Sequence, residues 1–225
     1  MRDAVNLAWK LHLVTQGRAE LDLLDSYERE RRTHVRGTLE RTLFLARRLE
    51  ADSGAERLLR GLLLGAIGSL QPLKAVMRPL VSPPRLLGDG CFDPRSPLAG
   101  EHLPQVRLHA PSSLAFDGQG AAGDRDEAWT DDAIGYRGAL VFARGAAAPS
   151  LRATEWARTR GIAVRRLGED LVETEGRLGR WMSGHKADFA LVRPDRLIFG
   201  AGRSQALERI QRGYDAATAG ESFAA

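Results

Sequence analysis

Five prolines and three glycines between residues 82 and 104 divide this chain of 225 residues into two parts with different hydrophobic periodicity. Such a density of residues that break regular structure predicts a linker or an extended connection. Before it, apolar residues recur at the three- and four-residue steps of helices; after it, short apolar runs alternate with helical patterns. The sequence therefore predicts an α+β protein, with a helical segment at residues 1–81, a linker at 82–104, an α/β domain at 105–217 and a tail at 218–225.

The first part begins directly with an amphipathic helix, predicted over residues 3–16 and headed by Asp3, a residue type that favours helix starts. Longer helical patterns follow over residues 21–51 and 55–70. The first helix carries an apolar stripe formed by Val5, Ala8 and Leu11. An amphipathic helix needs another surface to cover such a stripe.

The second part carries the patterns of a small α/β unit. The expected elements, in order, are a strand at 138–143, a helix at 151–160, a strand at 162–167, a short helix at 177–183, strands at 189–192 and 197–200, and a helix at 204–217. The last two strands are joined by Arg193-Pro194-Asp195-Arg196, a tight-turn sequence with proline at its second position. A strand, a helix and a strand, followed by a hairpin and a helix, is the order of a thioredoxin-type unit.

The charge pattern and the apolar runs argue against two classes of partner. The formal net charge is only +4 and acidic residues are interleaved with the arginines, so no segregated basic face for nucleic acid is expected. The most apolar stretch, residues 58–80, is interrupted by charged residues and prolines, which argues against a membrane span.

The start of the chain lacks a signal-peptide pattern, which predicts a cytoplasmic location. Cys91 is the single cysteine, so no intramolecular disulfide or cysteine redox pair is possible.

No metal site or catalytic constellation is predicted from the polar residues. The histidines have no zinc-binding spacing and are interpreted as surface residues: His12, His34, His102, His109 and His185. Two acidic pairs, Asp131-Asp132 and Glu173 with Glu175, are interpreted as exposed loop residues. Residues 118–123 match the letters Gly-x-Gly-x-x-Gly, but no apolar strand precedes them and no convincing helix follows. They are interpreted as a loop.

Both ends of the chain resemble one enzyme family. The stretch from Asp3 to Leu11, Asp-Ala-Val-Asn-Leu-Ala-Trp-Lys-Leu, resembles the segment that follows the glycine-rich flavin turn in FAD-dependent aromatic-ring hydroxylases, the class A flavoprotein monooxygenases, and residues 23–32 continue the similarity. Residues 100–105 and 189–200 are similar to the opening and closing stretches of the C-terminal domain of phenol and 3-hydroxyphenylpropionate hydroxylases. The resemblance implies a helical remnant of the flavin monooxygenase domain followed by a thioredoxin-like domain.

The same resemblance implies which residues would lie near the flavin. In the family the first helix points its N-terminus toward FAD, which places Asp3 and Asn6 within reach of the cofactor. The alternatives are a plain N-cap for Asp3 and a surface or interdomain hydrogen bond for Asn6. Trp9 is interpreted as a packing residue. Contacts with a sheet of the flavin domain are expected for Tyr27, Glu28 and Arg31.

Two interpretations of function remain open. The first is the C-terminal portion of an FAD-dependent monooxygenase that uses NAD(P)H and O2 to hydroxylate a phenolic compound. This portion is either a truncated form of the enzyme or a separate chain that is completed by a partner carrying the FAD domain. Since the glycine-rich turn is missing, this chain alone is not expected to hold FAD or to be active. The second is a non-catalytic interaction or dimerisation module with a redox-inert thioredoxin-like domain. In either case the uncovered helices predict earlier hydrogen exchange, or self-association, at residues 1–50 than at 138–200.

Overall fold

The computed structural model describes residues 2–49, 61, 65, 90–109 and 127–219. The chain forms two compact units. One unit joins residues 1–28 to residues 89–225, and the other comprises residues 29–88. The start of the chain therefore belongs to the same compact unit as the C-terminal part. The unit formed by residues 1–28 and 89–225 is called the C-terminal unit below.

Two helices confirm the predicted pattern of the first part. Helix α1 spans Arg2–Thr15 and helix α2 spans Asp22–Leu49. Gly17 follows α1 with φ of +65°, a left-handed conformation that ends helices and that glycine adopts without steric cost. The helix predicted at residues 55–70 lies outside the described residues, apart from single positions.

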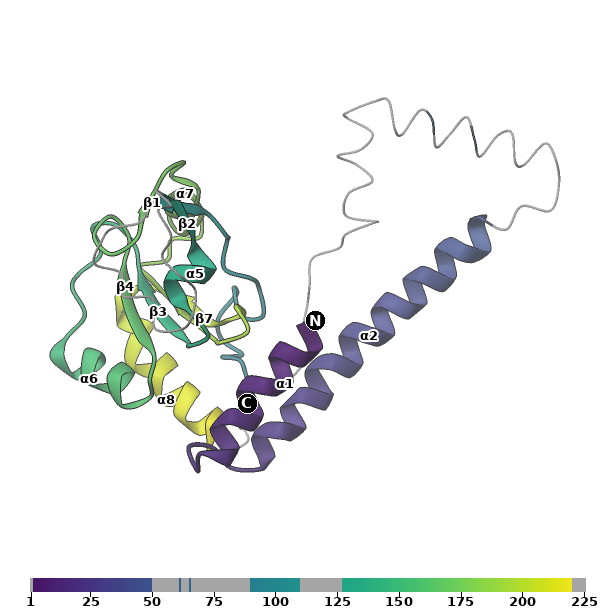
Figure 1. Cartoon of the computed structure of the whole chain (residues 1–225), viewed down its shortest axis with the longest axis horizontal. Coiled ribbons are helices and arrows are strands. Elements are labelled where there is room, and N and C mark those ends of the chain that lie inside the picture. The colour runs from purple at the N-terminus through teal and green to yellow at the C-terminus, as the bar shows by residue number, and fades with distance from the viewer. Residues whose placement is uncertain (1, 50–60, 62–64, 66–89, 110–126, 220–225) are drawn as a thin grey trace. The chain divides into compact units, whose positions relative to one another are not determined.

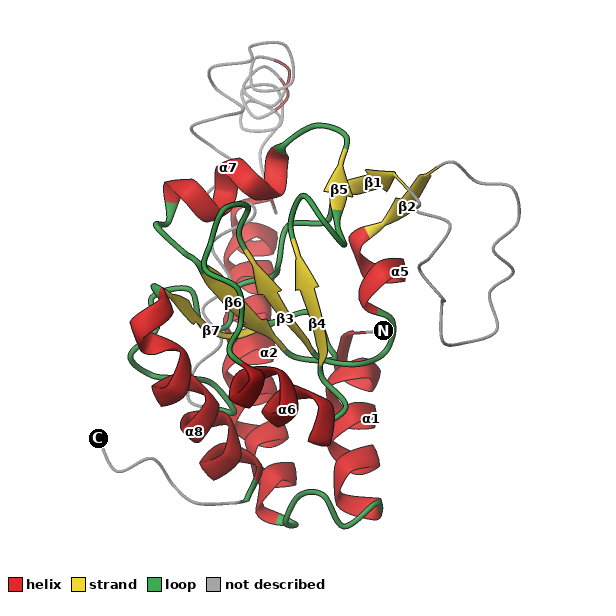
Figure 2. Cartoon of the chain, turned by 90° about the vertical axis from the view of Figure 1, so that its left-hand side faces the viewer, coloured by secondary structure: helices red, strands yellow, loops and turns green. Residues whose placement is uncertain are grey.

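A four-stranded mixed sheet forms the centre of the second part. Its order is β4-β3-β6-β7; β3 and β4 are parallel, and the other neighbours are antiparallel. The bounds are β3 Ala139–Phe142, α6 Leu151–Thr159, β4 Ala163–Arg166, α7 Arg177–Gly184, β6 Phe189–Val192, β7 Ile198–Gly202, η1 Ser204–Ala206 and α8 Leu207–Thr218. Each of these elements except the short helix η1 was predicted, and η1 is the first turn of the predicted last helix. Figure 2 shows α6 and α8 in front of the sheet and α7 at one end of it.

Local chemistry explains these elements. All residues of β3 and β6 are buried, as expected for continuous apolar runs at the centre of a sheet. The hydroxyl of Ser150 accepts a hydrogen bond from the backbone N–H of Ala153 at 3.1 Å and so caps the start of α6. Gly161 follows α6 with φ of +62° and turns the chain into β4.

Four short elements were not predicted. A second sheet has the order β2-β1-β5 and is antiparallel throughout. It consists of β1 (Arg107–His109), β2 (Glu127–Trp129) and β5 (Val172–Glu173), and helix α5 (Thr130–Ile134) follows β2 directly. Strands of two or three residues are too short to show a period-two pattern.

The described part of the predicted linker, residues 90–104, contains a series of turns and is hydrogen-bonded to β7. The Asp93 N–H donates to the Phe199 carbonyl at 2.8 Å, and the Ile198 N–H donates to the Glu101 carbonyl at 2.8 Å. The Ser96 hydroxyl accepts from the Ala201 N–H at 2.9 Å. This segment therefore covers the outer edge of β7 and satisfies its polar groups.

The core has two layers, one on each face of the main sheet, because alternate strand residues point to opposite faces. One layer contains Val141, Leu171, Leu178, Met182, Ala190 and Ile198. The other contains Leu140, Phe142, Phe189, Phe199, Ile210 and Tyr214, and it also includes Trp9 of α1 and Leu23 of α2. Helix α1 is thus part of the core of the C-terminal unit. Figure 1 shows the end of α8 beside the α1–α2 turn, where the Glu20 N–H donates to the Thr218 carbonyl at 3.2 Å.

Candidate functional site

Arg193, in the hairpin between β6 and β7, is the largest fully buried side chain of the described residues. Its guanidinium donates to both carboxylate oxygens of Asp195, from Nε at 3.0 Å and from Nη2 at 2.6 Å. Nη1 donates to the Cys91 carbonyl at 2.9 Å. The charge also lies over the ring of Phe92, 4.4 Å from its centroid, and over that of Trp9, at 5.0 Å. A buried cation in this setting has both a bidentate anion and aromatic partners.

Helix α1 contacts the same ion pair. The Asn6 side-chain amide donates from Nδ2 to Oδ2 of Asp195 at 2.8 Å, and both side chains are buried. The two sequence motifs that carry the family resemblance, at the start of the chain and in the hairpin, therefore meet although 189 positions separate them. We use the name α1 latch for the group of four side chains that meet here: Arg193, Asp195, Asn6 and Trp9.

The turn that presents the latch is itself held in place. Arg196 has φ of +69°, a strained conformation for a side chain other than glycine. Its guanidinium pairs with Asp131, with Nε 3.0 Å from Oδ1, and also donates to the Asp131 and Gly135 carbonyls. The Arg193 N–H donates to the Leu197 carbonyl at 2.8 Å and closes the hairpin. These contacts offset the strain of the turn.

The structure places each predicted flavin-proximal residue on α1. Asp3 is exposed and lies within the first helical turn, not before it, so its charge faces the positive end of the helix dipole. Asn6 donates a hydrogen bond to Asp195, which belongs to the same compact unit as α1. Trp9 is confirmed as a packing residue, with 6% of its surface exposed. Of the residues predicted to contact a flavin-domain sheet, Tyr27 and Arg31 are half-buried and Glu28 is exposed.

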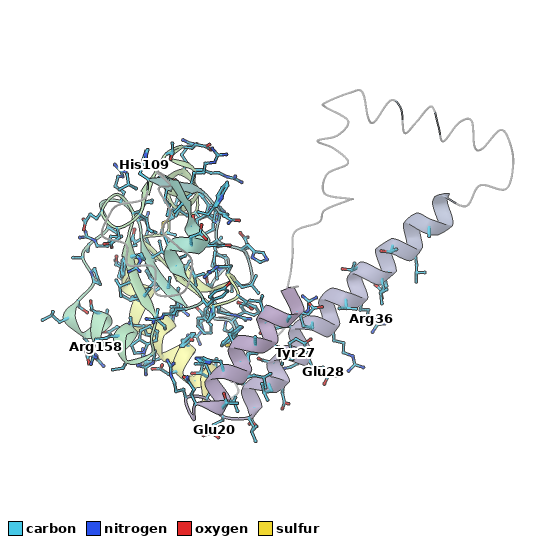
Figure 3. All side chains as sticks on the ribbon, viewed as in Figure 1. Glu20, Tyr27, Glu28, Arg36, His109 and Arg158 are labelled. Carbon is cyan, nitrogen blue, oxygen red and sulfur yellow. The ribbon has the colours of Figure 1, made fainter. Side chains whose placement is uncertain are left out.

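The remaining polar candidates have structural roles or point to solvent. Among the described side chains, His12, His109 and His185 are exposed, His102 is half-buried, and no group of acidic, histidine or cysteine residues could hold a metal ion. Figure 3 shows His109 and Arg158 on the outside of the C-terminal unit. The side chain of His34 and residues 118–123 lie outside the described part.

The prediction that both acidic pairs are exposed loop residues was wrong in part. Glu173 is half-buried and accepts hydrogen bonds from the backbone N–H groups of Leu178 and Gly179, at 2.7 and 2.9 Å, at the start of α7. Asp131 is half-buried by its pairing with Arg196. The sequence could not show these partners because they come from other elements.

The described residues do not form a dinucleotide-binding site by themselves. Such a site needs a strand, a glycine-rich turn and a helix whose N-terminus faces the phosphates. Across residues 90–109 and 127–219, none of the observed strands leads through such a turn into a helix. Nor does any helix in the described ranges have the length and apolarity needed to cross a membrane.

Comparison with known proteins gives matches at both ends of the chain. A family model described as FAD binding domain matches residues 1–42, and one described as HcaD C-terminal domain matches residues 120–217. The 3-(3-hydroxy-phenyl)propionate/3-hydroxycinnamic acid hydroxylase of Klebsiella pneumoniae is 29% identical over 88% of this chain and 38% of the relative. The enzyme of the same name from Mycolicibacterium gilvum is 27% identical over 96% and 40%.

Solved structures show the same fold. The anhydrotetracycline hydroxylase OxyS of Streptomyces rimosus matches with a TM-score of 0.63 and 23% identity, over 96% of this chain and 40% of that one. The aromatic hydroxylase CabE from angucycline biosynthesis matches with a TM-score of 0.62, 23% identity and the same coverage. These matches support a similarity of this chain to the C-terminal portion of FAD-dependent aromatic-ring hydroxylases. The chain spans about 38–40% of the length of the curated relatives it matches.

Proposed function

We propose that this chain provides the C-terminal part of an NAD(P)H- and O2-dependent hydroxylase that acts on a phenolic compound. The observation that carries the proposal is the α1 latch, since it joins the FAD-domain motif to the C-terminal motif through Asn6 and Asp195. The curated relatives are named for hydroxylation of 3-(3-hydroxy-phenyl)propionate and 3-hydroxycinnamic acid, which supports a phenolic substrate class. When bound, FAD would supply the oxygen chemistry, and the protein the binding and orientation.

In this proposal the head of α1 is the part of the chain nearest the flavin. The exposed first turn carries Asp3, and the helix dipole gives that end a partial positive charge. Asn6 is held by Asp195 and would position this end of the helix. A cytoplasmic location stays a prediction from the sequence.

We also propose that the C-terminal domain is thioredoxin-like and redox-inert. The strand–helix–strand–helix–hairpin–helix order and the sheet order β4-β3-β6-β7 support the first part. The second part follows from the single cysteine, Cys91, which has 2% of its surface exposed. With no second cysteine, dithiol exchange within the chain is impossible.

The test is a flavin-binding measurement on the purified chain. We expect a colourless protein that retains no FAD after dialysis and does not oxidise NADPH, because the phosphate-binding turn is missing. Stoichiometric FAD with a flavin absorbance band would contradict this part of the proposal. The alternative function, an interaction module without catalytic partners, gains support if the chain forms a defined homodimer and no FAD-domain polypeptide restores NADPH oxidation.

A further inference from the structure

The guanidinium of Arg193 contacts two segments that come from different parts of the chain. The first is helix α1, where the centroid of the Trp9 ring lies 5.0 Å from the guanidinium carbon. The second is residues 90–93. We call them the re-entry segment, because the chain has returned there to the C-terminal unit after residues 29–88. In this segment the ring of Phe92 faces the guanidinium, with its centroid 4.4 Å away. One buried charge therefore has an aromatic partner in each segment.

The re-entry segment is also bound to the guanidinium by a hydrogen bond. Nη1 of Arg193 donates to the Cys91 carbonyl at 2.9 Å. Two residues further on, the Asp93 N–H donates to the Phe199 carbonyl of β7 at 2.8 Å. This second bond lies at the end of the segment, so it breaks when the segment opens. The exchange rate of the Asp93 amide therefore reports that opening.

Helix α1 helps to keep the guanidinium away from water. The Arg193 side chain is fully buried, and Trp9, whose ring lies against it, has 6% of its surface exposed. Since part of Trp9 reaches the surface, loss of its ring would open a path for water to the charge. A cation–π contact is stronger when the cation is desolvated than when water surrounds it, by a factor of about five in the equilibrium constant. The strength of the contact between Arg193 and Phe92 therefore depends on α1.

We propose that Arg193 couples the docking of α1 to the docking of the re-entry segment. Each segment strengthens the contact of the other with the guanidinium, because each keeps water away from the charge. Coupling of this kind is reciprocal, so opening of either segment favours opening of the other. Movement of the re-entry segment is thereby transmitted to the start of the chain. The inference concerns contacts within this chain and does not depend on the proposed enzymatic function.

The experiment measures native-state hydrogen exchange in the full 225-residue chain. Trp9→Ala removes the ring that lies against the guanidinium. Leu13→Ala is the matched control, since Leu13 lies one helical turn further along α1 and packs against the same core layer. The Asp93 amide is compared with the Gly100 amide, which donates to the Ile198 carbonyl of β7 at 2.9 Å. Both amides bind the same strand, but only the first lies in the re-entry segment.

We expect Trp9→Ala to lower the protection of the Asp93 amide about fivefold relative to that of the Gly100 amide. Leu13→Ala should leave the ratio of the two protections unchanged. Equal losses at both amides in Trp9→Ala, or a fivefold change of the ratio in Leu13→Ala, would show a general loss of stability and overturn the coupling. An unchanged Asp93 amide in Trp9→Ala would overturn it as well.

A chain without the buried charge separates electrostatic coupling from packing. Arg193→Met with Asp195→Asn removes both charges and keeps an acceptor for the Asn6 amide. Adding Trp9→Ala to this chain should leave the ratio of the two amides unchanged, and a fivefold change there would overturn the role of the charge.

A fluorinated ring gives the same information if the charge-free chain does not fold. Replacement of Phe92 by pentafluorophenylalanine keeps the shape of the ring but removes its negative face, so the attraction to the guanidinium is lost while the packing stays. In the fluorinated chain Trp9→Ala should no longer change the ratio of the Asp93 and Gly100 protections. A fivefold change that persists after fluorination would show that packing alone connects the two segments, and the inference would be wrong.

Discussion

Replacing Asp195 with alanine should strongly destabilise the C-terminal unit. The side chains of Arg193 and Asp195 are 0% and 4% exposed, so the substitution leaves a buried guanidinium without its anion. Removing one partner of a buried ion pair costs about 3–5 kcal/mol. Arg193 would keep the Cys91 carbonyl and the rings of Trp9 and Phe92, which places the expected loss near the lower limit, about 3 kcal/mol.

Native-state hydrogen exchange measures this loss within the unit concerned. Amides of β3 and β6, the two central strands of the main sheet, are expected to exchange through global unfolding of the unit. Since about 1.4 kcal/mol corresponds to a factor of ten, their protection should fall by about a hundredfold. Glu155→Gln, which breaks the solvent-exposed pair with Arg158, is the matched control and should leave the protection unchanged.

A double variant tests the reasoning about the buried charge. Arg193→Met with Asp195→Ala removes both partners, so no uncompensated charge remains and the protection should lie above that of Asp195→Ala alone. If Asp195→Ala lowers the protection less than the double variant does, the electrostatic account of the α1 latch is wrong. The hairpin would then be held by packing alone.

Two further predictions concern single side chains. Burial raises the pKa of Tyr214, which lies edge-on to Trp156 and Phe199. Because this pKa is higher in the folded state, the group leaves the free energy of unfolding constant below the unfolded-state pKa of about 10 and lowers that free energy as the pH rises further. Tyr214→Phe removes the titrating group, so the free energy of unfolding measured by urea titration should fall less steeply above that pH. An equally steep loss in the variant would contradict this. The chain should show no insulin-disulfide reductase activity, and activity that Cys91→Ser abolishes would refute the redox-inert domain.

The local elements could be predicted from the sequence because each carries its own pattern. The apolar runs at residues 139–142 and 189–192 are long enough to identify as strands, and glycines mark the ends of α1 and α6. The second sheet could not be predicted, since β1, β2 and β5 have at most three residues each and pair with residues far away in the chain.

The candidate site was predictable in its parts but not in their connection. The sequence identified α1 and the Arg-Pro-Asp-Arg turn as separate motifs, and an interdomain hydrogen bond was one interpretation of Asn6. Nothing local shows that Arg193 is fully buried or that its partners include Phe92, because these contacts depend on how β7 and residues 90–104 pack.

The expectation of early hydrogen exchange at residues 1–50 also changes, since residues 1–28 share a unit with the C-terminal part. We now expect α1 to be protected with β3 and β6.

The most direct test of the account is oxygen insertion by a completed enzyme. The N-terminal FAD-binding part of the Klebsiella pneumoniae relative is joined to this chain, and 3-(3-hydroxy-phenyl)propionate is supplied with NAD(P)H and isotopically labelled O2. The account predicts a flavin-containing protein that oxidises NAD(P)H and incorporates one labelled oxygen atom into the ring, while this chain alone does neither. A folded fusion that retains FAD but never hydroxylates this compound or another phenol would contradict it.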